Sequence, residues 1–137
     1  MKTTSKSCRS IFRSQKGQNL IEFALVLPIL LLVVFGIAEF GRAWMTRNIM
    51  TGAAREAARI AAVPPPGGSV AAAEARGNSI LSTAGIATTV TVTDLGVSFG
   101  TVTATVNYAF PVAIAGFFGS GVATFPLSSS TSMRREY

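Results

Sequence analysis

The chain has 137 residues, of which 49% are hydrophobic and 13% are charged, and its formal net charge is +6. A soluble domain has about 25% charged residues, so we expect part of this chain to have lipid as its solvent. The sequence contains no histidine and a single cysteine, Cys8. This composition excludes an intramolecular disulfide, the usual zinc, copper and haem ligand sets, and the Ser–His and Cys–His nucleophile pairs. We therefore expect no cofactor and no enzymatic activity.

The positive charge is concentrated at the N-terminus. Five basic residues and no acidic residue precede position 17, namely Lys2, Lys6, Arg9, Arg13 and Lys16. From Gln18 onward, seven arginines are balanced by six acidic residues. A nucleic-acid partner is not expected, because these arginines form no basic stripe with interleaved aromatic residues. The basic tail instead predicts membrane topology, since basic residues flanking an apolar helix stay in the cytoplasm.

An apolar segment follows the basic tail. Residues 20–38 contain one charged residue, Glu22, and as a helix they would span about 28 Å, close to the hydrocarbon thickness of a bilayer. We predict a transmembrane helix here, with the N-terminus cytoplasmic. Pro28 lies inside it, and membrane helices tolerate such a proline through local rearrangement.

The helix is expected to continue beyond the membrane. Residues 39–62 contain no proline and are rich in good helix formers. Trp44, with Phe40 nearby, suits an anchor at the outer head groups. Three prolines and two glycines at 64–68 end the helix, so one continuous helix over 20–62 would be about 65 Å long.

The remaining sequence predicts a small α+β domain. Residues 69–83 have helical composition, with a serine suited to the N-cap. Residues 87–95 and 99–110 alternate between apolar and hydroxyl side chains, which predicts two half-buried strands joined as a hairpin. A third strand over 122–133 is interrupted by Pro126, which would place that strand at an edge of the sheet.

The apolar segment 111–118 is too short to cross a bilayer. It could fill the domain core or form a loop that leans on the membrane. We favour the core, because a small domain needs apolar surface to bury.

The most informative motif lies where the basic tail meets the apolar helix. It reads Lys16-Gly17-Gln18-Asn19-Leu20-Ile21-Glu22-Phe23, with a carboxylate five positions after a glycine. A charged side chain at the centre of a membrane helix costs about 2.5–3.5 kcal/mol, and less near its end. Glu22 is thus either an interfacial residue with no role or a residue kept for a function.

The motif resembles the prepilin-type signal sequence of type IV pilins and pseudopilins. The resemblance implies that a prepilin peptidase cuts between Gly17 and Gln18 on the cytoplasmic side. It also implies that Glu22 acts in subunit assembly by pairing with the new N-terminal amine of a neighbouring subunit. Such a pair makes physical sense, because a carboxylate buried among packed helices is costly without a partner.

A finer resemblance is to the TadE-like pseudopilins of tight-adherence (Tad/Flp) pilus systems. The run from Gly17 to Phe23, the following Ala-Leu-Val-Leu-Pro and the Ala/Arg-rich residues 52–61 are similar to that family's N-terminal region. The resemblance implies a minor pilin or pseudopilin that takes part in pilus assembly for adhesion or secretion. The implied partners are the prepilin peptidase, the major Flp-type pilin, other pseudopilins, the inner-membrane pilus platform and the membrane. The chain is longer than Flp-type major pilins, which argues against a major-subunit role.

Three alternatives remain. A conventional signal peptidase could cut after Ala38, the end of a small-x-small triplet, and release a soluble protein. An uncleaved signal anchor could carry an extracytoplasmic binding domain. An outer-domain enzyme is the third, but the acidic residues fall on different predicted elements, and nothing in the sequence implies the separation of about 5–10 Å that paired-carboxylate catalysis needs.

The sequence therefore predicts an α+β, pilin-like fold in three parts. Residues 1–17 form a basic prepilin-type leader, residues 18–63 a transmembrane and extended helix, and residues 64–137 an extracytoplasmic domain with a short helix and an antiparallel sheet of about three strands. The expected location is the cytoplasmic (inner) membrane, crossed once, with entry into the pilus as a further possibility.

Overall fold

The computed structural model describes residues 15–64, 68–94, 96, 99–117, 119, 121 and 123–135. The chain divides into two compact units, one ending at Ile37 and the other comprising Ala38–Tyr137. The α+β class is confirmed: a long helix is followed by a short helix and a three-stranded antiparallel sheet.

Helix α1 (Gln15–Ala62) runs without a break through Pro28. It begins a few residues before the predicted start and ends where predicted, just before the proline-rich segment. Its first part carries the only stretch in the described residues that is long and apolar enough to cross a membrane, with a mean hydropathy of 2.8. Its second part belongs to the unit Ala38–Tyr137.

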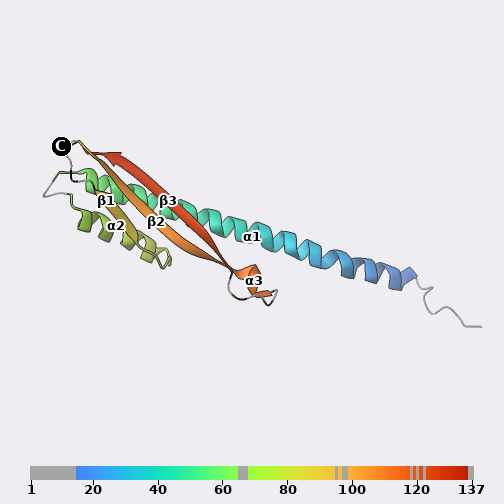
Figure 1. The fold of residues 1–137 in the computed structure, drawn as a ribbon. Helices are drawn as coiled ribbons and strands as arrows, with labels where there is room; N and C mark the ends of the chain where they lie inside the picture. The colour runs from blue at the N-terminus through green and yellow to red at the C-terminus, as the bar shows by residue number, and fades with distance from the viewer. Residues whose placement is uncertain are drawn as a thin grey trace, which may run out of the picture. The chain divides into compact units, whose positions relative to one another are not determined.

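The sheet consists of β1 (Val90–Asp94), β2 (Thr101–Val112) and β3 (Ala123–Arg134), in the order β1-β2-β3. Figure 1 shows β2 between the other two strands. All pairing is antiparallel, with Val90 opposite Val106 and Phe110 opposite Phe125. The predicted hairpin and the predicted third strand are therefore confirmed, although β1 is shorter than expected.

The core of this unit lies between the helices and one face of the sheet. Alternate residues of each strand face inward, and Val102, Ala104 and Val106 are fully buried. The opposite face carries hydroxyl side chains such as Thr91 and Ser130, which are exposed. The two-residue period of the sequence thus corresponds to a sheet with one buried face and one solvent-exposed face.

Helix α2 (Val70–Thr83) packs beside β1 (Figure 1). Ser69 is its N-cap and accepts a hydrogen bond from the amide of Ala72 at 3.1 Å, as predicted. Two α2 side chains also accept hydrogen bonds from β1: Asn78 Oδ1 from the amide of Val90 at 2.7 Å, and Glu74 Oε1 from the amide of Val92 at 3.1 Å. The backbone amides of Val90 and Val92 at the outer edge of β1 therefore donate hydrogen bonds to side chains rather than to another strand.

Two expectations differ from the structure. Strand β3 is at an edge, as predicted, but it is not interrupted at Pro126, which pairs with Ala109 inside the ladder. An edge strand accommodates proline because its missing amide can be the one that faces away from the sheet.

The described side chains of segment 111–118 contribute to the core only in part. Strand β2 continues to Val112, and the short helix α3 (Ala113–Phe117) follows. Pro111 and Ala113 are exposed, whereas Ile114 is half-buried and the half-buried Val112 packs against the core. The difference arises because the segment lies at the end of the sheet, where an apolar space lined by Val112 leaves the strands incompletely covered.

Candidate functional site

The predicted processing and assembly residues all lie at the start of α1. Gly17 and Gln18 are in its first turn and Glu22 is five positions after Gly17, about 7.5 Å further along the axis. Glu22 is exposed. The basic leader residues Lys2, Lys6, Arg9 and Arg13 lie outside the described residues. Lys16 lies in α1, but its side chain is outside the described part.

The Gly17–Gln18 peptide lies where a helix is easiest to unwind. The first four amides of an α-helix have no intrahelical acceptor, so opening this turn breaks few hydrogen bonds. A methyl group at Gly17 would meet no atom within 4 Å outside its own helix turn and chain neighbours. Packing in the folded chain therefore does not require glycine at this position, and a substitution there tests recognition rather than folding.

The apolar part of α1 presents its side chains outward on every side. No residue in its membrane-length window is buried, and the described residues leave large side chains such as Phe23 (61% exposed) and Ile29 (67%) largely uncovered. Such a surface is stable in lipid or against other apolar helices, and not in water. Glu22 is the only charged side chain within the segment 20–38.

The Ala/Arg-rich second motif has a structural role that its sequence only partly indicated. Its alanines lie in the core and are at most 2% exposed, namely Ala53, Ala54, Ala57, Ala58 and Ala61. Small side chains let the helix lie close to the strands. The charged residues of the motif face outward, as predicted, and Arg59 pairs with Glu56 at 3.0 Å.

Glu56 also connects the two helices. Its carboxylate lies 3.8 Å from the guanidinium of Arg76 on α2. The hydrogen bond from Arg59, together with the charges of Arg59 and Arg76, lowers the pKa of Glu56 below its usual range, against a smaller opposing effect of burial. The same hydrogen bond raises the pKa of Arg59.

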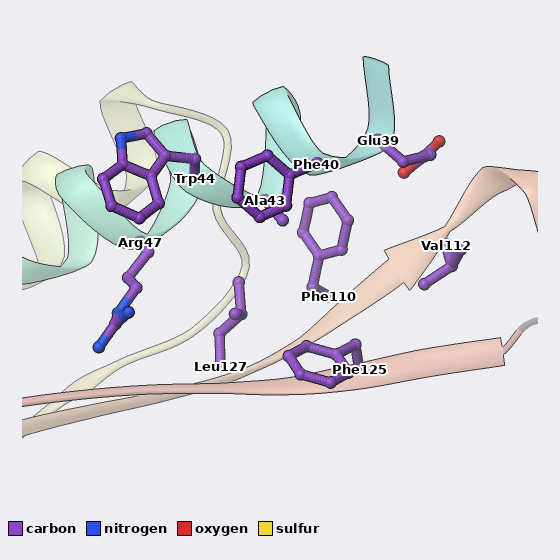
Figure 2. Close-up of a pocket in the computed structure, with 9 residues that line it drawn as sticks. All are labelled: Glu39, Phe40, Ala43, Trp44, Arg47, Phe110, Val112, Phe125 and Leu127. Atoms are coloured by element: carbon purple, nitrogen blue, oxygen red, sulfur yellow. The ribbon is translucent and has the colours of Figure 1, made fainter. Parts of the chain in front are cut away.

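The structure contains an apolar hollow that the sequence did not predict. It lies between residues 39–47 of α1, the end of β2 and the start of β3. Phe40 and Trp44 on the helix face Phe110, Phe125 and Leu127 on the strands (Figure 2). The hollow has a volume of about 410 Å³. The sequence predicts a membrane anchor at Trp44 and Phe40, which form the helix side of the hollow. The strand side could not be predicted, because the pairing of Phe110 with Phe125 depends on strand register, which the sequence does not specify.

The described residues contain no group of three or more His, Cys, Asp or Glu side chains that could hold a metal ion. Two of their acidic residues form ion pairs at separate places, Glu39 with Arg42 and Asp94 with Arg135.

Comparison with known proteins gives one family. The model of the TadE-like protein family matches residues 17–59, which begin at the predicted cleavage glycine and end within the Ala/Arg-rich motif. Neither the curated proteins nor the solved structures give a match. The matched segment lies within α1 and includes Glu22, whereas α2 and the sheet are outside it. Residues 17–59 of the chain are therefore similar to the TadE-like family, a family of structural, pilus-associated proteins.

Proposed function

We propose that the chain is a minor pilin, or pseudopilin, of a Tad-type (Flp) type IV pilus. The observation that carries the proposal is the TadE-like match, which starts at Gly17, five positions before Glu22, the only charged residue of the apolar segment 20–38. In this proposal residues 1–17 are a leader, 18–63 a transmembrane and extended helix, and 64–137 an extracytoplasmic domain. The N-terminus is cytoplasmic and the helix crosses the inner membrane once.

The first step of the proposed sequence is removal of the leader between Gly17 and Gln18 by a prepilin peptidase. The position of this peptide in the first turn of α1 supports the step, because a protease must bind an extended chain and little helix is lost by unwinding there. Glycine also has the lowest helix propensity apart from proline, which lowers the cost further. Cleavage leaves a positively charged amine on Gln18.

The second step is assembly. An exposed carboxylate on an apolar helix becomes costly once that helix is packed among others, unless a cation pairs with it. The new amine of a neighbouring subunit supplies such a cation, so Glu22 would set the axial register between helices. The major Flp-type pilin, other pseudopilins and the inner-membrane platform are the proposed partners, and the assembled pilus would serve adhesion or secretion.

The substitution Glu22→Gln tests this role, because it removes the charge and keeps the shape. We expect the variant to be inserted and cleaved like the wild-type chain and to lower the yield of assembled pili. Arg55→Gln is the control, since Arg55 is an exposed charged residue on the same helix outside the apolar segment. Normal pilus yield with Glu22→Gln would contradict the proposed role of the carboxylate.

A further inference from the structure

The core-facing side of the β2–β3 hairpin extends beyond the layer that covers it. Phe125, Leu127 and Ser129 alternate onto the same face, and Leu127 and Ser129 are buried. Phe125 is nevertheless 59% exposed. Its cross-strand partner Phe110 is only 4% exposed, and the guanidinium of Arg42 lies 5.2 Å from the centre of its ring. The sheet therefore ends in an aromatic surface that the chain itself covers only in part.

The exposed surface forms one wall of the hollow, and α1 forms the other. Phe40 and Trp44 are one helical turn apart, and their rings stack with centroids 6.2 Å apart. Figure 2 shows these two rings and Ala43 on the helix side, opposite Phe110, Phe125 and Leu127 on the strands. The hollow has a volume of about 410 Å³, which is within the range of pockets that hold small ligands, about 300–1,000 Å³.

The charges around the hollow favour an anion at its rim. Glu39 and Arg42 pair with each other at 2.8 Å, so their charges cancel. Arg47 also lines the hollow, and none of the ion pairs formed between described residues includes it. Within the described residues, Arg47 thus contributes one positive charge that no ion pair offsets, beside a space lined mainly by apolar side chains.

The position of the hollow along α1 identifies its surroundings. The uncharged stretch ends at Ala38, and the helix wall of the hollow starts at the next residue. At 1.5 Å per residue, Phe40 is about 3 Å and Trp44 about 9 Å beyond that end along the axis. The head-group region of a bilayer extends about 5–8 Å beyond the hydrocarbon on each side. The hollow therefore opens at the level where acyl chains meet head groups, the level that tryptophan prefers.

We propose that this hollow binds one phospholipid with an anionic head group, from the leaflet that borders the unit Ala38–Tyr137. One acyl chain lies between the aromatic walls, and the phosphate lies against Arg47. The site goes beyond the proposed function, since it requires insertion of α1 but neither leader cleavage nor pilus assembly. A bound lipid would cover Phe125 and hold the folded unit at the membrane surface before the subunit is assembled into a pilus.

Native mass spectrometry of the full chain in detergent tests the proposal, with equal amounts of phosphatidylglycerol and phosphatidylcholine added. We expect one retained phosphatidylglycerol per chain, with a preference of about fivefold over phosphatidylcholine, the effect of one basic side chain near an anionic head group. Ala43→Phe should abolish retention by filling the hollow, and Arg47→Gln should remove the head-group preference. Arg55→Gln, an exposed change on the same helix outside the hollow, should alter neither.

A second measurement keeps the test valid if Ala43→Phe does not fold. Trp44 is the only tryptophan of the chain, so its fluorescence reports on the hollow directly. Phosphatidylglycerol with a brominated acyl chain should quench it saturably, at one lipid per chain, and Arg47→Gln should raise the half-saturating concentration about fivefold. Quenching that only follows the bulk lipid fraction would overturn the proposal. A folded Ala43→Phe chain that retains lipid normally, or a second polypeptide found in place of the lipid, would overturn it as well.

Discussion

The substitution Gly77→Ala tests the packing between the two helices and the sheet. A methyl group at Gly77 would lie 2.6 Å from Cγ2 and 3.2 Å from Cβ of Val90, and 3.4 Å from Cβ of Ala57. Val90 is 3% exposed and β-branched, so its side chain cannot turn away freely. Overpacking of this kind costs about 1–3 kcal/mol, while alanine gains about 1 kcal/mol over glycine in helix propensity. We expect the variant to be about 1 kcal/mol less stable than the wild-type chain.

Gly52→Ala is the matched control, because Gly52 is exposed on α1 and a methyl group there meets no atom within 4 Å beyond its own turn and neighbours. Only the propensity gain applies, so this variant should be about 1 kcal/mol more stable. For a unit of this size, 1 kcal/mol corresponds to about 4–8 °C in Tm. Thermal unfolding of the full chain in detergent, followed by Trp44 fluorescence, should move in opposite directions for the two variants. Equal stabilisation by both would refute the close approach of α2 to Val90.

Two further predictions concern charged pairs of the same unit. Asp94→Asn should lower the free energy of unfolding by about 1–3 kcal/mol in urea titrations, because it removes a charge-assisted hydrogen bond between Asp94 and Arg135, whose side chains are only 17% and 13% exposed. An unchanged urea midpoint would argue against this. Because the pKa of Glu56 is lowered in the folded chain, its contribution is present above the usual glutamate pKa and is lost as pH falls through the lowered value. The Tm of the wild-type chain should therefore fall more steeply than that of Glu56→Gln between about pH 6 and about pH 3. Parallel curves of Tm against pH for the two chains would contradict this prediction.

The sequence predicted the elements whose signals are local. The apolar part of α1 follows from an uncharged run of residues, the end of α1 from the proline-rich segment, and the N-cap of α2 from Ser69. The two strands of the hairpin follow from the alternation of apolar and hydroxyl residues, and their inward faces were assigned correctly.

The features that the sequence did not predict depend on contacts between distant residues. The continuation of β3 through Pro126 depends on which side of the strand is bonded, and the aromatic hollow depends on the register that sets Phe110 against Phe125. The capping of β1 by Asn78 and Glu74 requires α2 to lie beside that strand. Hydrophobicity alone could not show that Pro111 and Ala113 are exposed, because this depends on how far α1 covers the end of the sheet.

The central claim, that the chain is a prepilin-type subunit, is tested most directly by the N-terminal sequence and mass of the protein extracted from membranes. We expect a mature chain that begins at Gln18. The control substitution Gly36→Ala lies within the apolar segment, where a methyl group meets no atom within 4 Å beyond its own turn and neighbours. This variant should have the same N-terminus as the wild-type chain. A chain that retains Met1 would indicate an uncleaved signal anchor, and one that begins at Glu39 a secreted domain. Either result would contradict the account.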